Sequence, residues 1–372
     1  MRIIHIITGL HIGGAERMLE KLLIQEIDSK NTLIISLSSI GEIGANLEKL
    51  GYDLVAIDLK KNLFSLIKGF FKIRRYIRAF KPNIVQTWLY HSNLIGSLAS
   101  LFLNINVVWN LRGTSIPQGF FSMTNFVIIV LSFLSYFMPK KIICCGASVK
   151  EAHRKMGFSD KKMIVIPNGY DFKNFKKNDA AGLKIRQKYN VKESDILIGS
   201  VGRFDPLKDH DNFIQACAMI RKHNKDIEFI IIGRDINSKN NALMSILIKH
   251  NMDDDIILID EQKSLNSFYS AMDIFCLHSL SEGFPNVLVE AMANSLPCVS
   301  TDAGEAEIIL NNSEYTVRVN NPIDLSKKLL SVAELSVEKR KQLGFNNSNR
   351  VKNKYDIRKI KKIYFDLYKQ LS

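Results

Sequence analysis

The stretch 273–310 constrains the fold more than any other part of the chain, because strand and helix patterns alternate in it. An apolar run at 273–277 is typical of a buried strand, and a Gly/Pro loop then leads to Asn286, a residue type that often caps a helix N-terminus. An apolar helix over about 287–293 and a second strand at 297–301 follow. Two strands joined through a helix form a βαβ unit with parallel strands. The sequence therefore predicts a parallel α/β fold.

Two carboxylates lie at the mouth of this βαβ unit, Glu282 in the loop and Glu290 in the helix. Backbone N–H groups at a helix N-terminus attract anions, above all phosphates. Carboxylates beside such a site would repel a phosphate, so they favour contact with the hydroxyls of a sugar-bearing ligand. A buried helix with two solvated glutamates is the alternative, and spacing alone does not decide between them.

The same alternation continues along all 372 residues, and polar loops follow strands in both halves of the chain. This length favours two domains rather than one. We therefore expect two doubly wound, Rossmann-like α/β domains that face a central cleft. The N-terminal domain is predicted to cover 1–170 and the C-terminal domain 171–355, with the polar stretch 171–179 as the linker.

The net charge of +14 belongs almost entirely to the first half. Residues 1–178 carry 24 Lys and Arg against 11 Asp and Glu, whereas 179–372 carry 27 against 26. Nucleic acid and the anionic cytoplasmic leaflet are the partners that such a charge favours. Aromatic and aliphatic residues recur between cations at helical spacing over 60–78, as in a basic amphipathic helix. The pattern fits a membrane-surface helix and a core-packing helix with a solvated basic face equally well.

Two further segments bear on the cellular compartment. The apolar run 126–138 is shorter than the roughly 20 residues of a bilayer span, so we expect a core helix or an interfacial one. The N-terminal run is broken by His5 and is interpreted as a first buried strand, not a signal peptide. Five scattered cysteines favour reduced thiols and hence the cytosol.

Three loops of the first half are candidate ligand contacts. Gly13 and Gly14 open a helix that is predicted to run to about Ile27, and a glycine loop suits close approach to a diphosphate, although a lone Gly-Gly is more often only a turn. His91 follows a strand, at the edge where parallel sheets bind ligands; a satisfied loop histidine is the alternative. Arg112 follows the next strand and could meet an anionic acceptor.

In the second half, Arg203 and Lys208 flank a proline turn after a strand. A planar guanidinium and a mobile ammonium so placed suit a diphosphate, although two such cations are usually surface charge. Gly233 and Arg234 end the following strand and could line a nucleotide base. The acidic run 253–255 is interpreted as a solvated turn. No His, Cys or carboxylate cluster has metal-ligand spacing, so no metal is expected.

Glu282 and Glu290 together form a Glu-x7-Glu signature, and this segment resembles the donor site of retaining glycosyltransferases of family 4 (glycosyl transferases group 1), which have the GT-B fold. The segments 83–93, 198–210 and 268–310 are similar to that family in the right order. The resemblance implies that Glu290 binds the ribose of a nucleotide and that Glu282 lies near the transferred sugar.

The resemblance also implies roles for the other candidates and for the end of the chain. A final helix at about 356–372 is expected to cross back to the N-terminal domain. The implied catalytic residues are His91, Glu282, Arg203 and Lys208, and Arg112 is the candidate for the acceptor. The implied donor-binding residues are Gly13, Gly14, Arg203, Lys208, Gly233, Arg234, Glu282, Gly283, Phe284, Pro285, Asn286, Val287, Leu288 and Glu290.

The implied reaction moves a hexose or N-acetylhexosamine from a nucleotide diphosphate donor, most often UDP in this family, to an acceptor hydroxyl, with retention and without metal or cofactor. The basic, aromatic-rich first half favours a lipid-linked glycan acceptor of bacterial surface polysaccharide assembly (capsule, O-antigen or exopolysaccharide). Such an enzyme would be cytoplasmic and would contact the anionic inner face of the cell membrane peripherally. Nucleic acid is not expected as a partner. A nucleotide-sugar 2-epimerase or hydrolase on the same fold, and a basic non-enzymatic binding module, are the alternatives.

The chain departs from the family pattern at two places. Asn294 and Ser295 follow the glutamate helix where the family commonly has Cys-Gly, and Asn tolerates the left-handed conformation that such a helix end needs. The segment 303–306 is also slightly unusual after the last strand, which bears on the sugar preference and not on the reaction.

Overall fold

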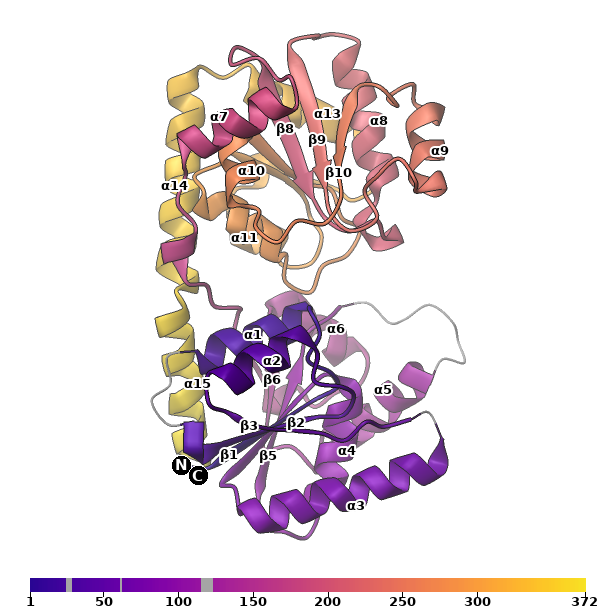
Figure 1. Ribbon diagram of the computed structural model, residues 1–372, viewed down its shortest axis with the longest axis vertical. Coiled ribbons are helices and arrows are strands. Elements are labelled where there is room, and N and C mark those ends of the chain that lie inside the picture. Colours follow the sequence, from indigo (N-terminus) through magenta and orange to yellow (C-terminus); the bar gives the residue numbers. More distant parts are fainter. Residues whose placement is uncertain (25–28, 61, 115–122) are drawn as a thin grey trace. The chain divides into compact units, whose positions relative to one another are not determined.

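The protein is described by a computed structural model that covers residues 1–24, 29–60, 62–114 and 123–372 (Figure 1). The chain forms two compact units. Unit 1 consists of Met1–Tyr170 and Ile357–Ser372, and unit 2 consists of Asp171–Asp356. Each unit contains one parallel sheet with helices packed against it, which is the Rossmann-like architecture that the strand and helix alternation predicts.

The sheet of unit 1 has the strand order β3-β2-β1-β4-β5-β6-β7. Its strands are β1 (Ile3–Ile7), β2 (Thr32–Ser36), β3 (Asp53–Ala56), β4 (Ile84–Trp88), β5 (Asn106–Leu111), β6 (Lys141–Cys144) and β7 (Met163–Val165). All residues of β1 and β4 are buried, as expected for parallel strands covered on both faces. The chain leaves β1 toward one edge and β4 toward the other, so the topological switch point lies between these two strands.

The helices of unit 1 form two groups by their contacts. α1 packs against α2 and α15, whereas α4 packs against α3 and α5. The helices are α1 (Gly14–Leu23), α2 (Gly41–Lys49), α3 (Leu63–Phe80), α4 (Tyr90–Ser100), α5 (Met123–Leu134), α6 (Ala147–Lys155) and α15 (Ile357–Leu371), with short 3-10 turns at Ser29–Asn31 and Asp160–Lys162.

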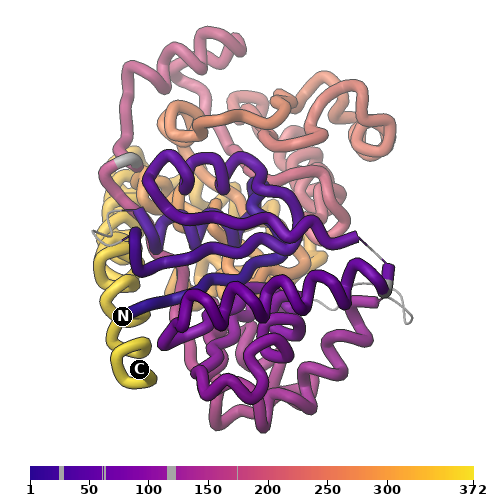
Figure 2. Tube along the Cα trace, turned by 60° about the horizontal axis from the view of Figure 1, so that its bottom comes forward, coloured from indigo at the N-terminus to yellow at the C-terminus, as the bar shows by residue number. Residues whose placement is uncertain are grey.

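The last helix, α15, belongs to the core of unit 1. Its residues Ile357, Ile360, Tyr364, Leu367 and Tyr368 join the same buried cluster as β1 and α1. The Tyr364 hydroxyl accepts a hydrogen bond from Asn110 Nδ2 at 2.9 Å, and the Tyr368 hydroxyl donates to Gln86 Oε1 at 3.0 Å. Figure 2 shows the two chain ends next to each other in this unit. The predicted return of the C-terminal helix to the first domain is therefore confirmed.

The sheet of unit 2 has the order β10-β9-β8-β11-β12-β13, with the switch point between β8 and β11. Its strands are β8 (Ile196–Val201), β9 (Ile227–Ile232), β10 (Ile256–Ile259), β11 (Ile274–Leu277), β12 (Cys298–Thr301) and β13 (Thr316–Val317). Its helices are α7 (Asp179–Lys188), α8 (His210–Arg221), α9 (Asn241–Lys249), α10 (Asn266–Ala271), α11 (Asn286–Ala293), α12 (Ala306–Leu310), α13 (Pro322–Ala333) and α14 (Val337–Tyr355), with 3-10 turns at Phe172–Asn174, Pro206–Lys208 and Ser313–Tyr315.

Several local expectations shift by a few residues. α1 ends at Leu23, before the predicted end near Ile27, which lies outside the described residues. Asn286 is the first helical residue of α11 rather than its cap, because Pro285 occupies the cap position. The left-handed residue after α11 is Ser295, with φ 61°, and not Asn294. Asn294 is the C-cap residue of α11, with φ −81° and ψ 13°, so the reversal falls one residue later.

The structure also bears on the acidic run 253–255 and on the question of a membrane-spanning helix. The acidic run 253–255 lies in the turn before β10, where Asp255 Oδ1 is 3.0 Å from Arg221 Nε. Within the part of the chain that the structure describes, no helix combines the length and the hydropathy needed to cross a bilayer.

Candidate functional site

The loops that follow β8 and β11 meet at the switch point of unit 2. Lys208 Nζ, from the first loop, is 2.5 Å from Glu282 Oε1, from the second. Both side chains are largely buried, with exposed fractions of 21% and 12%. The Ser279 hydroxyl donates a second hydrogen bond to the same carboxylate oxygen at 2.7 Å. The structure therefore brings together two of the predicted site residues, at the sheet edge where open α/β folds bind ligands.

A buried histidine, His278, fixes the backbone of the Lys208 loop. His278 Nδ1 lies 2.5 Å from the Lys208 carbonyl, and Nε2 lies 2.7 Å from the Ser200 hydroxyl. Because a carbonyl only accepts hydrogen bonds, Nδ1 carries the proton and Nε2 accepts from Ser200. Burial keeps the pKa of His278 well below its ordinary value, so the ring is neutral at pH 7. A backbone bond from Leu280 N to Leu207 O, 2.8 Å long, joins the two loops directly.

Arg203 is held by Asp205, two residues further along the same loop. Its Nε and Nη2 donate to Asp205 Oδ2 at 3.0 and 2.7 Å. Partial burial would raise the pKa of Asp205, but the bonds from Arg203 and from the Leu207 amide outweigh it and lower that pKa. Half of the Arg203 side chain is exposed. Its guanidinium is therefore oriented by Asp205 while remaining accessible to a ligand.

The loop after β9 packs against the start of the Arg203 loop. A Cβ on Gly233 would lie 2.1 Å from the Gly202 carbonyl oxygen, so only glycine allows this close approach. The Phe204 amide donates to the Arg234 carbonyl at 2.9 Å. Gly233 and Arg234 are thus adjacent to the Gly202–Arg203 segment, and the Arg234 side chain is exposed.

The helix α11 begins directly after the Glu282 loop, which supplies Gly283, Phe284 and Pro285. Phe284 is buried, and its ring makes an edge-to-face contact with the Tyr355 ring, with 5.5 Å between the two ring centres. This contact anchors the loop to α14. Asn286, Val287 and Leu288 form the first turn of α11, and the backbone amides of this turn are the positive end of the helix dipole.

Glu290 lies one turn into α11 and is partly exposed. The Tyr269 hydroxyl donates a hydrogen bond to Glu290 Oε2 at 3.2 Å. Tyr269 itself is fully buried in α10, so it offers the carboxylate a rigid partner. One Glu290 oxygen is therefore oriented by the protein, as expected for a carboxylate that binds a ligand hydroxyl.

A second glycine holds the Glu282 loop in place. Gly304 follows β12 and has φ 61°, in the left-handed region that favours glycine. A Cβ at this position would lie only 1.7 Å from the Glu282 carbonyl oxygen. The backbone of Glu282 is therefore packed directly on Gly304, and no other residue type fits there without moving the loop.

The switch point of unit 1 carries the glycine loop and His91. Gly13 is the extended residue before α1, which begins at Gly14. The Thr8 hydroxyl, after β1, lies 3.1 Å from the Ser92 hydroxyl, next to His91 in the first turn of α4. Burial lowers the pKa of the half-buried His91, which favours the neutral ring. The structure therefore brings the glycine loop and His91 to neighbouring positions of one sheet edge.

The residue that places His91 is in a strained conformation. Leu89 lies between β4 and α4 with φ 72° and ψ 163°, a region that large side chains rarely adopt. Its amide donates to the Asn110 carbonyl at 3.1 Å. Such strain persists only where surrounding contacts impose it, and it is common at functional sites.

Arg112 extends from the end of β5 across an aromatic ring. Its guanidinium carbon is 5.3 Å from the centre of the Trp88 ring. Both terminal nitrogens are buried and have no hydrogen-bond partner among the described residues. Burial raises the pKa of nearby Glu16, although the charge of Arg112 counteracts part of this effect. An arginine fork with unused donors is suited to a phosphate or carboxylate ligand.

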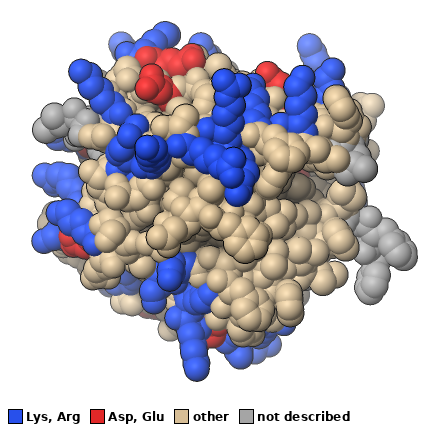
Figure 3. All heavy atoms as spheres, turned by 90° about the horizontal axis from the view of Figure 1, so that it is seen from below, with Lys and Arg blue, Asp and Glu red and all other residues tan. Residues whose placement is uncertain are grey.

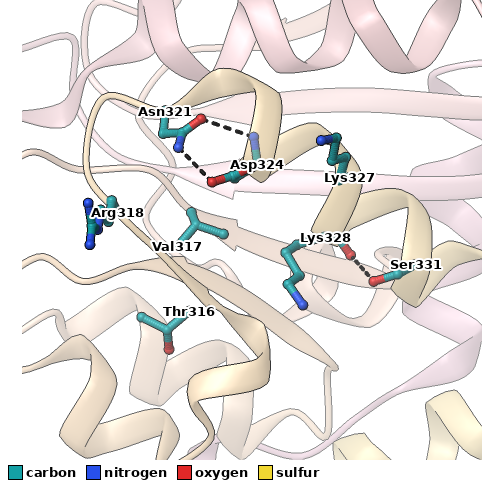
Figure 4. Close-up of a pocket in the computed structure, with 8 residues that line it drawn as sticks. All are labelled: Thr316, Val317, Arg318, Asn321, Asp324, Lys327, Lys328 and Ser331. Carbon is teal, nitrogen blue, oxygen red and sulfur yellow. Dashed lines mark hydrogen bonds between the residues drawn. The ribbon is translucent and has the colours of Figure 1, made fainter.

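Two other features of the described residues bear on whether the protein has a further site. No group of three or more His, Cys, Asp or Glu side chains within them has an arrangement that would hold a metal ion. A pocket of about 550 Å³ lies between β13 and α13, with Arg318, Lys327 and Lys328 around it (Figure 4). None of the predicted site residues lines this pocket, and its Asn321 and Asp324 bond to each other as the cap of α13.

Four residues of the site were not found by sequence reasoning: His278, Ser279, Tyr269 and Gly304. His278, Tyr269 and Gly304 act through contacts with residues at least 21 positions away, so no short motif contains these pairs. Ser279 lies three positions before its partner Glu282 in the same loop. His278 and Gly304 follow strands, and that position is the one signal that could have marked them.

Comparison with known families gives two matches that together span most of the chain. Residues 183–350 match the family described as glycosyl transferases group 1. Residues 29–174 match glycosyltransferase family 4. The first match contains Arg203, Lys208, Glu282 and Glu290, and the second contains His91 and Arg112.

Characterised relatives are similar at low identity. A capsular polysaccharide biosynthesis glycosyltransferase of Staphylococcus aureus is 24% identical over 304 residues, 79% of this chain and 78% of the relative. A UDP-Gal:α-D-GlcNAc-diphosphoundecaprenol α-1,3-galactosyltransferase of Escherichia coli is 25% identical over 324 residues, 84% of this chain and 81% of the relative.

Solved structures show the same fold. The Anabaena protein HepE in complex with UDP aligns over 100% of both chains with a TM-score of 0.87 and 18% identity. The lipopolysaccharide outer core galactosyltransferase WaaB aligns over 100% of both chains with a TM-score of 0.71 and 14% identity. The expected GT-B fold is thereby confirmed.

Proposed function

Because this chain belongs to glycosyltransferase family 4, we propose that it transfers a sugar from a nucleotide diphosphate donor to a lipid-linked glycan acceptor, with retention of anomeric configuration. UDP is the proposed nucleotide, and a hexose or N-acetylhexosamine the proposed sugar. The proposed pathway is bacterial surface polysaccharide assembly, such as capsule, O-antigen or exopolysaccharide. Relatives that act in capsule synthesis and on a diphosphoundecaprenol-linked sugar support this choice.

The observation that carries the proposal is the Lys208–Glu282 contact at the switch point of unit 2. A cation suited to a diphosphate and a carboxylate suited to sugar hydroxyls meet there, next to the start of α11. We assign Lys208, Arg203 and the first amides of α11 to the diphosphate, Glu282 to the transferred sugar and Glu290 to the ribose. Gly233 and Arg234 are assigned to the base, beside the Arg203 loop.

Catalysis in this proposal is electrostatic. Negative charge builds on the leaving diphosphate, and preorganised donors aimed at that charge lower the barrier without a metal ion. Lys208 and Arg203 supply the charges in unit 2. His91, neutral because of its burial, is assigned to the sugar, and Gly13 and Gly14 to the leaving group. No general base is assigned, since the leaving phosphate itself can take the acceptor proton in a front-side attack.

Arg112 is the proposed contact for the acceptor. A lipid-linked glycan of the diphospho-polyprenol type carries two phosphates, and both terminal nitrogens of Arg112 lack a hydrogen-bond partner among the residues that the structure describes. A bidentate contact would satisfy both at once. We place the enzyme in the cytoplasm, peripherally bound to the inner face of the membrane where such an acceptor resides.

A thermal-shift screen tests the donor assignment. Wild type and Glu290→Ala are measured with UDP-, GDP-, ADP- and dTDP-sugars. Stabilisation by one donor that is lost in Glu290→Ala is the expected result. If no nucleotide sugar stabilises wild type, the transferase proposal fails and a basic binding module takes its place. If the enzyme released free sugar from the donor without any acceptor, it would instead be a hydrolase. If it converted the donor sugar to its 2-epimer without any acceptor, it would be an epimerase.

A further inference from the structure

The helix α5 exposes a stripe of large apolar side chains on the face away from the core. Val127, Ile128 and Leu131 are buried against unit 1. On the other side, the exposed fractions of Phe126, Ile129 and Phe133 are 63%, 67% and 68%. The stripe begins at Met123 and continues past the helix end, and it also includes Tyr136 and Phe137. A helix that is apolar on both faces needs a second apolar environment for its outer face.

The helix α3 shows the same feature with cations added. Phe64, Ile67 and Phe71 are exposed and recur at the spacing of one helix face. Lys68, Arg75 and Arg78 are exposed on the same side, opposite the buried Ile73 and Ile77. Aromatic residues beside Lys and Arg on one exposed face are typical of helices that lie in a membrane interface.

The helix α4 connects α3 and α5 into one layer. It packs against both neighbours. Arg74 of α3 donates from Nη1 to the Ala99 and Leu101 carbonyls, at 2.9 and 2.8 Å, at the end of α4. The next residue, Phe102, is 91% exposed. The apolar side chains of the three helices therefore lie on one side of unit 1, which we call the α3–α5 face.

The charge of this part of the chain is uniform. Between residues 59 and 150 the sequence contains 12 Lys and Arg and no Asp or Glu. This stretch includes all of α3, α4 and α5. Figure 3 shows the view from below, where Lys and Arg lie along the upper part, the left side and the bottom of a broad area without charged side chains, and acidic groups are few. Such a surface attracts anions over its whole extent.

We propose that the α3–α5 face binds an anionic lipid bilayer, with the α5 stripe inserted among the acyl chains and the cations of α3 on the headgroups. Aromatic and aliphatic side chains provide the insertion, and Lys68, Arg75 and Arg78 provide the attraction to anionic lipid. A contact between two copies through this face would bring like charges together, because acidic groups that could pair with the cations are missing from this stretch. The bilayer therefore fits the face better than a second copy of the chain does.

The orientation of the helices supports a role in acceptor supply. Helices of a parallel α/β unit run antiparallel to the strands, so α3 and α5 begin at the carboxyl edge of the sheet. Phe64 and Phe126, in or near the first turns of these helices, therefore lie toward the same edge as His91. The inference rests on the proposed function only here, because a lipid-linked acceptor gives the enzyme a reason to bind a bilayer at that edge.

Vesicle flotation of the full chain tests the proposal without donor or acceptor, so its outcome does not depend on the transferase activity. The vesicles are phosphatidylcholine alone and phosphatidylcholine mixed with phosphatidylglycerol. Wild type is expected to float with the mixed vesicles and far less with phosphatidylcholine alone. Phe126→Ser/Ile129→Ser/Phe133→Ser should lower the partition coefficient about tenfold or more. Lys68→Gln/Arg75→Gln/Arg78→Gln should remove the preference for phosphatidylglycerol.

Matched controls come from exposed residues of unit 2. Phe345→Ser, at a residue that is 56% exposed on α14, and Lys327→Gln/Lys339→Gln/Lys341→Gln should float like wild type. A thermal unfolding curve like that of wild type establishes that a variant is folded. If the α5 variant does not fold, the α3 variant still tests the proposal. Equal flotation of wild type and both variant sets would overturn the proposal. So would a wild-type dimer in light scattering that the α5 variant dissociates, because a second copy would then cover the stripe.

Discussion

Lys208 and Glu282, which are 74 positions apart in the chain, form the closest ion pair at the switch point of unit 2, with 2.5 Å between Nζ and Oε1. The pair joins the two loops that a ligand at this sheet edge would contact. A diphosphate would compete with Glu282 for the Lys208 ammonium, so donor binding must rearrange or share this contact. The pair therefore also provides the most direct test of the donor site.

Lys208→Gln should lower kcat/KM by about 10²–10³-fold, because the ammonium stabilises charge that develops on the leaving diphosphate. Lys222→Gln removes an exposed cation from the same unit and should have no effect. The measurement is initial rate against donor concentration. A Lys208→Gln enzyme with the wild-type rate would contradict the assignment.

Tyr269→Phe should raise the donor Kd about 3- to 10-fold, because Glu290 loses one oriented hydrogen bond. Tyr269 is a positioning residue, so kcat at saturating donor should stay unchanged. Calorimetric titration with the nucleotide diphosphate gives the Kd. Tyr315→Phe, in the same unit, serves as the control, and an equal Kd in the two variants would show that Tyr269 does not act through Glu290.

Gly304→Ala should destabilise unit 2 by about 2–4 kcal/mol, because the new methyl group meets the Glu282 carbonyl and the residue has a positive φ. Stabilisation by donor should be lost as well, since the Glu282 loop must move. Gly113→Ala is the control, because a Cβ there meets no atom of the described residues within 4 Å. Chemical denaturation with and without donor measures both effects. A wild-type free energy of unfolding in Gly304→Ala would show that the loop adapts without cost.

Arg112→Gln should raise the KM for a diphosphate-linked acceptor about tenfold or more and leave the KM for donor unchanged, since a charged hydrogen-bond donor is lost. Lys49→Gln, an exposed cation of α2, is the control. Rates are measured with acceptors that carry or lack the diphosphate. Equal losses with both acceptors would assign Arg112 to structure and not to the phosphates.

The stability of unit 1 should fall between pH 7 and pH 5 because of His5. Burial lowers the pKa of this residue from 6.5 to about 3, and its Nδ1 accepts a hydrogen bond from Trp88 Nε1 at 3.2 Å. The unfolded chain binds a proton below pH 6.5 and the folded chain does not, so stability present above that pH is lost as pH falls. At pH 5 the loss from this residue is about 2 kcal/mol.

His5→Asn keeps an acceptor for Trp88 but does not titrate, so its Tm should fall less than the wild-type Tm between pH 7 and pH 5. His11→Asn, at an exposed position, should behave like wild type. Thermal unfolding followed by circular dichroism gives the Tm values. Parallel Tm curves for wild type and His5→Asn would mean that His5 is not the source of the pH dependence.

Much of the fold could be predicted from local patterns. Apolar runs of four to six residues, each followed by a polar or glycine loop and an amphipathic segment, predict β8, β11 and their neighbours as parallel strands. Because ligand loops follow the strands of such sheets, Lys208, Glu282 and His91 could be selected as candidates before any tertiary structure was known. The capping of α11 was less predictable, since a shift by one residue costs little energy locally.

The hydrophobic pattern of α5 is not sufficient to predict how this helix packs. Apolar residues occupy both faces of this helix, so periodicity cannot indicate which face packs on the sheet, and a core helix and an interfacial helix were equally compatible. The structure decides this, because Val127, Ile128 and Leu131 are buried and Phe126, Ile129 and Phe133 are not.

The sequence by itself determined the alternation of strands and helices, the two halves of the chain and the residue types at the ends of the strands. These properties depend on hydrophobic periodicity and backbone preference, which act over a few neighbouring residues. Only the tertiary structure decided that Lys208 meets Glu282, that His278 holds the Lys208 loop and that Gly304 supports Glu282. Contacts between residues so far apart arise from the order of strands in the sheet, which no local pattern encodes.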